Sequence, residues 1–226
     1  MGLDMFHQNE IARALRMVVS GASLLGAEVS GGFVVTVASN RLFPAGALVR
    51  LVDDTGQVEE HVVAEALGVD QVRLEAEVAG TFGPTAKARL QLREGAAARL
   101  KWVAQGRPEM MPEPRRAQLP AVVVEPVGMK QPANAGTNRT YQQEYEFDVF
   151  YIRKVAEGEE AGVELGAEIA DLFNLVMSDP YLEETCWHAQ VTEVEMRPRE
   201  EEELRRKQAG VQVVRMGVLA QRAEVW

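Results

Sequence analysis

Apolar residues recur every three or four positions near the start of the chain, which predicts an amphipathic first helix. Over residues 4–19, Ile11, Leu15, Val18 and Val19 fall on one side of the helical turn. The pattern stops at Gly21, and a glycine just past the last periodic residue commonly ends a helix. We therefore expect this helix to bury one face and to end near residue 20.

Between residues 31 and 92 the pattern changes to short β-branched runs separated by turn residues. Runs at 33–37, 47–52, 60–63 and 71–74 predict strands, and the segments 53–56 and 68–70 predict hairpin turns. This texture predicts a small all-β barrel or sandwich of about five or six strands.

The pattern in the rest of the chain predicts two strands at 121–125 and 144–151, a second helix at 157–178, and two more strands at 187–196 and 211–226. Tyr145, Phe147, Val149 and Tyr151 alternate with acidic residues, so one strand face is expected to be core and the other wet. Residues 96–104 are compatible with a short helix. The final strand exceeds the usual ~5–6 residues, which predicts a ribbon that reaches toward a neighbouring subunit.

Together these elements predict an α+β fold. We expect an antiparallel or mixed sheet with two helices on one face, plus the inserted all-β barrel or sandwich. Residues 1–30 and 93–226 are assigned to the α+β core, and residues 31–92 to the inserted β-rich domain.

Composition and charge exclude several classes of function. The 226-residue chain has 34 acidic and 24 basic residues and a formal net charge of −10, which argues against a dedicated binder of DNA or anionic membranes. Its one cysteine rules out an intramolecular disulfide and a cysteine-based zinc site. The chain shows neither a signal-peptide pattern nor the ~20 consecutive apolar residues of a membrane span, so we expect a cytosolic protein with no membrane partner.

Two small groups of residues are candidates for chemistry. Glu144, Glu146 and Asp148 share one strand face at spacings of about 7 Å. This spacing suits a catalytic carboxylate pair or a row of metal ligands, but also a solvated sheet face or the lining of a polar channel. Cys186 and His188 share a face without a further acid, base or ligand for a triad or a zinc site. We expect no catalytic residue, cofactor or metal, with a small carboxylate- or thiol-dependent enzyme as the alternative.

A charged segment near the end of the chain holds blocks of opposite sign. Such blocks suit pairing between adjacent subunits, while a solvated hairpin tip is the alternative. The candidate interface residues are those of this segment, two arginines of the basic stretch before residue 119 and the last residue: Arg115, Arg116, Arg197, Arg199, Glu200, Glu201, Glu202, Glu203, Arg205, Arg206, Lys207 and Trp226.

The order of elements resembles that of the tail terminator, or tail-completion, proteins of tailed bacteriophages. The resemblance rests on residues 119–124, 145–151, 171–180, 191–194 and the terminal strand, with the first helix at 11–19 as a matching start. It covers about residues 4–19 and 119–226. The β-rich stretch at 31–92 departs from the minimal family pattern.

The resemblance implies a non-enzymatic virion protein of the tail and neck, assembled in the host cytoplasm. Family members form six-subunit rings that cap the tail tube, end its polymerisation and face the head connector. The expected partners are further copies in a homohexameric ring, the tail tube protein and the head–tail connector or a head-completion protein, with a sheath protein as a further candidate. DNA would only pass through, so Glu144, Glu146 and Asp148 are candidates to face the lumen. The alternative is another neck or head-completion protein.

Overall fold

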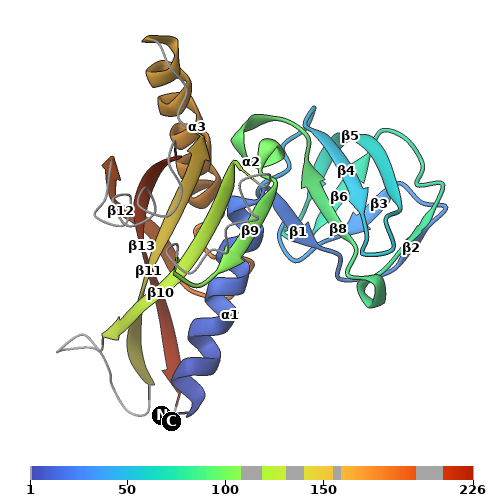
Figure 1. Cartoon of the computed structure of the whole chain (residues 1–226). Helices are drawn as coiled ribbons and strands as arrows, with labels where there is room; N and C mark the ends of the chain where they lie inside the picture. The colour runs from blue at the N-terminus through green and yellow to red at the C-terminus, as the bar shows by residue number, and fades with distance from the viewer. Residues whose placement is uncertain (1, 108–118, 131–139, 155–158, 197–210, 226) are drawn as a thin grey trace.

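The computed structural model describes residues 2–107, 119–130, 140–154, 159–196 and 211–225. Of residues 2–5, 140–141, 159–161 and 224–225 it describes the backbone only. The fold is α+β and has two lobes (Figure 1). One lobe combines a sheet with the two long helices, and the other consists of short strands.

The first helix, α1 (Gly2–Val19), has the buried face that its periodicity predicts. Ile11, Leu15, Val18 and Val19 are completely buried. The helix ends as the backbone N–H of Gly21 bonds to Val18 O at 2.9 Å and Gly21 takes a φ of +63°. A Cβ on Gly21 would also lie 3.0 Å from the Cβ of Ala97, so both conformation and space favour glycine here.

The core lobe is built on a five-stranded sheet in the order β12-β13-β11-β10-β9. Its strands are β9 (Trp102–Gln105), β10 (Ala121–Lys130), β11 (Thr140–Lys154), β12 (His188–Met196) and β13 (Val211–Val225). All neighbours pair antiparallel except β9 and β10, which are parallel.

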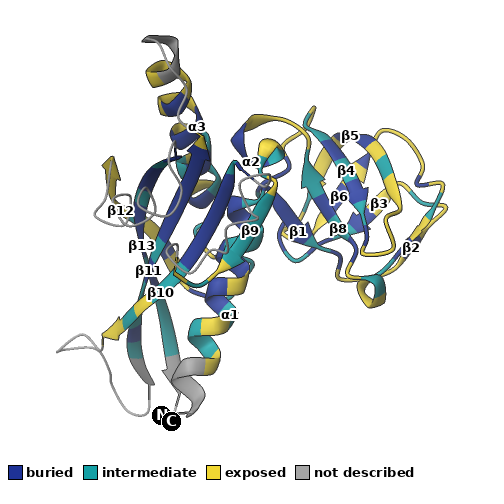
Figure 2. Ribbon diagram, viewed as in Figure 1, coloured by how far each residue is buried: buried dark blue, intermediate teal, exposed yellow. Residues whose placement is uncertain are grey.

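One face of this sheet packs against α1 and α3 (Glu159–Ser178). Tyr145, Phe147, Val149 and Tyr151 of β11 all lie in the same buried cluster as Ile11 of α1, as the alternation of β11 predicts. The opposite face of the sheet carries a second buried cluster, which includes Leu119, Val123, Phe150, Ile152 and Val213. Figure 2 shows buried residues along the centre of the sheet and exposed ones toward its ends. The two faces therefore differ in what covers them.

The second lobe is a curled antiparallel sheet in the order β1-β8-β4-β5-β6-β3. Its strands are β1 (Ala22–Leu24), β3 (Val34–Thr36), β4 (Leu48–Val52), β5 (Val58–Leu67), β6 (Gln71–Leu74) and β8 (Arg89–Leu92), with β2 (Val29–Ser30) and β7 (Thr81–Phe82) as a separate pair and a 3-10 turn at Pro84–Ala86. This sheet starts with β1, which precedes the domain boundary predicted at residue 31.

The two edges of the six-stranded sheet meet. The N–H of Gly26 donates to Thr36 O and that of Ala38 to Leu24 O, each at 2.9 Å, beside a bridge between Leu25 and Val37. The two lobes also share one buried apolar cluster, which runs from Val72 in β6 to Leu172 in α3. The lobes are therefore joined by packing as well as by the chain.

Two expectations are corrected. The helix expected at 96–104 ends early: α2 spans only Gly95–Arg99, and Trp102–Gln105 forms β9 because it pairs with β10 in the sheet. The long final strand does not leave its own domain. It lies inside the sheet, paired with β11 from Val211 to Val225 and with β12 on its other side.

Candidate functional site

The strongest candidate site is the polar part of the sheet face that α1 and α3 leave uncovered. Glu144, Glu146 and Asp148 of β11 are half-buried and alternate with the core residues Tyr145 and Phe147. They therefore lie on one face, in the row that their spacing predicts.

Basic residues of the neighbouring strands pair with this row. Lys130 of β10 lies 2.5 Å from Glu146 Oε1, and this hydrogen bond raises the pKa of the Lys130 ammonium. Arg215 of β13 lies 3.5 Å from Asp148 Oδ2, and the amide of Gln221 donates to Glu144 Oε1 at 3.0 Å. The acidic row is thus embedded in a network of polar side chains.

Arg215 links the row to the next strand. Its Nη2 lies 2.6 Å from Glu193 Oε1 and 2.9 Å from Glu195 Oε2, both on β12. Within the part of the chain that the structure describes, the carboxylates of this network outnumber its cations. Most side chains of this network line a groove of about 380 Å³.

A bulge in β12 shapes this groove. The pairing of β12 with β13 shifts between Val191 and Glu193, and Thr192 donates a hydrogen bond to Gly217 O at 3.2 Å. A Cβ on Gly217 would lie 2.8 Å from Thr192 Oγ1 and 3.0 Å from Glu193 Cγ. The absence of a side chain at Gly217 therefore leaves room for the bulge.

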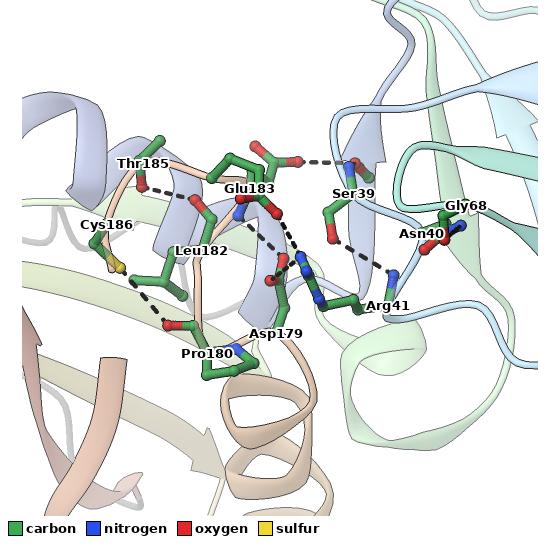
Figure 3. Close-up of polar contacts among 12 residues, drawn as sticks. Ser39, Asn40, Arg41, Gly68, Asp179, Pro180, Leu182, Glu183, Thr185 and Cys186 are labelled. Atoms are coloured by element: carbon green, nitrogen blue, oxygen red, sulfur yellow. Dashed lines mark hydrogen bonds and ion pairs between the residues drawn. The ribbon is translucent and has the colours of Figure 1, made fainter. Parts of the chain in front are cut away.

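A second polar cluster joins the two lobes and is drawn in Figure 3. It is centred on the loop after α3, where Leu182, Glu183 and Glu184 have φ values of 45°, 55° and 63°. Three successive non-glycine residues in the left-handed region cost free energy, so surrounding contacts must hold the loop. These contacts come from Asp179 and from the β lobe.

Asp179 is completely buried, and its Oδ2 accepts the backbone N–H of Glu183 at 3.0 Å. The carboxyl of Glu183 accepts a bond from the hydroxyl of Ser23 in β1 at 2.9 Å, and Ser23 in turn accepts the N–H of Ser39 at 3.0 Å. Burial, with a further contribution from the negative Asp179, raises the pKa of Glu183 to about 7. A carboxyl group of the core lobe is thus anchored to the first strand of the β lobe.

Arg41 of the β lobe completes the junction. Its Nη1 lies 2.6 Å from Glu184 Oε1 and 3.7 Å from Asp179 Oδ1, and its guanidinium lies 4.4 Å from the ring centroid of Tyr181. Figure 3 shows Arg41 pointing from the β lobe toward this loop. One cation therefore contacts three residues of the loop.

The thiol of Cys186 is not activated by its surroundings. Cys186 is buried, its Sγ lies 3.7 Å from Pro180 O, and burial raises the pKa of the thiol to about 12. His188 is exposed, whereas Cys186 is buried. This environment favours the protonated thiol at neutral pH and argues against a thiolate nucleophile.

The twelve candidate interface residues lie outside the described residues: Arg115, Arg116, Arg197, Arg199, Glu200, Glu201, Glu202, Glu203, Arg205, Arg206, Lys207 and Trp226. Within the described ranges, no three His, Cys, Asp or Glu side chains are grouped to hold a metal ion. No helix among the described residues is long and apolar enough to cross a membrane.

Sequence reasoning missed Arg215, Lys130 and the junction residues Asp179 and Glu183. Arg215 lies 67 positions from Asp148, so no local pattern connects them. Asp179 precedes a proline, which signals the end of a helix but not a buried carboxylate. Comparison with protein-family models and with curated protein sequences gives no match to this chain.

Proposed function

We propose that this protein is a tail terminator of a tailed bacteriophage: a non-enzymatic virion protein that forms a ring, most simply a hexamer, on the end of the tail tube. The ring ends polymerisation of the tube and joins it to the head connector. Its partners are further copies of the chain, the tube protein and the connector or a head-completion protein, and DNA only passes through.

The observation that carries the proposal is the asymmetry of the five-stranded sheet. One face is covered by α1 and α3, whereas the polar part of the other carries Glu144, Glu146 and Asp148 in an acidic network. A channel for DNA needs a wall that does not bind phosphate, and carboxylates repel it. The order of the elements around this sheet supports the same assignment.

The β lobe is, in this proposal, a small closed barrel attached to the terminator core. The hydrogen bonds between Gly26 and Thr36 and between Ala38 and Leu24 support closure because they join the two edge strands of the sheet. A closed barrel leaves no open edge to aggregate, which suits a lobe that projects from a ring.

Electron microscopy of the purified protein tests the proposal most directly. We expect closed rings with a central hole, and light scattering after size-exclusion chromatography should give a mass close to six chains. A protein that remains monomeric at high concentration and low salt in both measurements would contradict the proposed function.

A further inference from the structure

Subunits of the proposed ring need a contact that repeats around it, and how they join rests on the proposed function. The five-stranded sheet has two outer strands, β12 and β9. Among the described residues, neither pairs with another strand on its outer side. A sheet can be extended at an outer strand by pairing with a strand of another chain.

The strand directions make these two edges compatible. β9 is parallel to β10, and each step from β10 through β11 and β13 to β12 is antiparallel. β12 therefore runs opposite to β9. Rotation about an axis along the strands preserves strand direction, so β12 of one copy would meet β9 of the next in the antiparallel sense.

The charges at the two edges are also complementary. Glu193 and Glu195 lie on β12 and are more than half and nearly half exposed, respectively, in their side chains. The exposed Arg107 follows β9 and pairs with Glu125 at 3.2 Å, and Lys101 precedes β9 and is exposed. An acidic edge thus faces a basic edge when copies follow one another head to tail.

The β12 edge also carries exposed apolar side chains. Val194 and Met196 are 42% and 50% exposed. At the other edge of the sheet, Trp102 and Val103 of β9 are only partly buried. Pairing the two edges would remove apolar surface from water at both.

We propose that neighbouring subunits join by antiparallel pairing of the outer edge of β12 with the outer edge of β9 in the next copy. This heterologous contact repeats around the ring and closes it. Since α1 and α3 cover one face of the sheet, the lumen is lined by the other, which holds Glu144, Glu146 and Asp148. The lumen is complete only when copies assemble.

The register within one chain gives a starting point for a cross-linking test. Ala104 pairs with Val123, Val123 with Phe150, Phe150 with Arg215, and Arg215 with Glu195. Ala104 and Glu195 therefore lie at the same level of the sheet. In a closed sheet the strands are staggered, so β9 and β12 of neighbouring copies can be offset from this level. Side chains alternate between faces with a period of two, so the possible offsets that keep the same face differ by two residues.

The experiment uses the full chain with Cys186→Ser and introduces cysteine pairs. The pairs are Ala104→Cys with Glu195→Cys, Ala104→Cys with Glu193→Cys, and Trp102→Cys with Glu195→Cys. The matched control is Ala104→Cys with Glu65→Cys, since Glu65 is an exposed residue of the β lobe. Each variant is oxidised at low salt and resolved on a non-reducing denaturing gel, and its melting curve checks folding.

We expect a ladder of covalent multimers up to the closed ring for at least one of the three pairs, and none for the control. Rings seen by microscopy without a cross-link in any of the three pairs would overturn the edge pairing and leave the proposed function standing. Monomers without cross-links would overturn both. A control that cross-links as strongly as the test pairs would also overturn the edge pairing.

Charge reversal supplies a second test without cysteines. Glu195→Lys should reduce the fraction of protein in rings severalfold at low salt, because the basic edge then meets a like charge. Adding Arg107→Glu to the same chain should restore rings. Failure of the double variant to assemble better than Glu195→Lys alone, with both folded, would count against the pairing.

Discussion

Among the residues that the structure describes, Glu168 of α3 lies at the centre of an enclosed ionic network. Its Oε2 accepts bonds from the hydroxyl of Tyr151 at 2.7 Å and from Arg153 at 2.9 Å, and its Oε1 lies 3.4 Å from Arg99. Burial and the bond to Glu168 raise the pKa of Tyr151. This network connects α3 to β11 and to α2.

Glu168→Ala is expected to lower the free energy of unfolding by about 3 kcal/mol, because Arg153 would lose a carboxylate that lies 2.9 Å away while remaining buried. Glu168→Gln should cost less, since it keeps a hydrogen-bond acceptor for Tyr151. Urea unfolding of both variants measures the difference. A loss below about 0.5 kcal/mol for Glu168→Ala would show that the network contributes little.

Glu183 predicts a pH dependence of stability. Its pKa is about 7 in the folded protein against an ordinary 4.5, so the folded state holds this proton more tightly than the unfolded chain does. Stability should therefore fall as pH rises from about 4.5 to about 7 and then level off, by an amount on the order of 3 kcal/mol. The charged groups around it are Asp179, Arg13, Arg41 and Glu184.

Urea unfolding at intervals between pH 4.5 and pH 8 checks this expectation. Glu183→Gln should flatten the decrease, because glutamine cannot release a proton, while Glu65→Gln on the exposed surface should leave it unchanged. An equal decrease in wild type and Glu183→Gln would assign the pH dependence to another group.

Cys186 should react slowly with iodoacetamide in the native protein at pH 7.5, because its thiol is buried and protonated. The same thiol should be modified rapidly in urea, which serves as the control. Cys186→Ser should leave assembly intact at a small cost in stability. Rapid native alkylation would revive the thiol-dependent enzyme as an alternative.

At the scale of elements, the strands and helices form where the local sequence pattern predicts them, except where pairing with a segment far away in the chain changes the secondary structure. The alternation of β11 and the periodicity of α1 predicted their buried faces, since one buried side suffices to set either pattern. The segment 96–104 has helix-compatible residues, yet pairing with β10 turns its second half into a strand. Propensity is weak enough for such a contact to override it.

Two glycines should respond in opposite ways to alanine. Gly217→Ala crowds Thr192 and Glu193 at the β12 bulge and should destabilise the protein by roughly 1–3 kcal/mol. Gly166→Ala lies on the exposed side of α3 with nothing within 4 Å of its added Cβ, and should stabilise by about 0.5–1 kcal/mol. Thermal unfolding compares them. A neutral Gly217→Ala would mean that the bulge can relax around a methyl group.

At the scale of the whole molecule, the net charge of −10 is partly organised on one sheet face. Among the described residues, Lys130 and Arg215 are the cations that pair with the acidic row, and they are fewer than its carboxylates. In the proposed ring this face is repeated around the lumen, which would concentrate the negative potential there.

Neutralising that row should increase non-specific binding of duplex DNA to the assembled protein. The triple variant Glu144→Gln, Glu146→Gln, Asp148→Asn is expected to bind severalfold more tightly at low salt, with the difference shrinking as salt rises. Fluorescence anisotropy with a labelled duplex measures this. The control replaces Glu65, Glu75 and Glu77 of the β lobe by Gln, which changes net charge equally; an equal effect of both would exclude a special role of the row.

The sequence alone determined which residues face the core along α1 and β11, because burial of one face imposes a period on neighbouring residues. It also placed the β-rich segment and the acidic row. Only the tertiary structure decided that the last strand lies inside the sheet, that Arg215 bridges β11 and β12, and that Glu183 anchors Ser23. These features depend on residues far apart in the chain, whose meeting is set by packing rather than by local pattern.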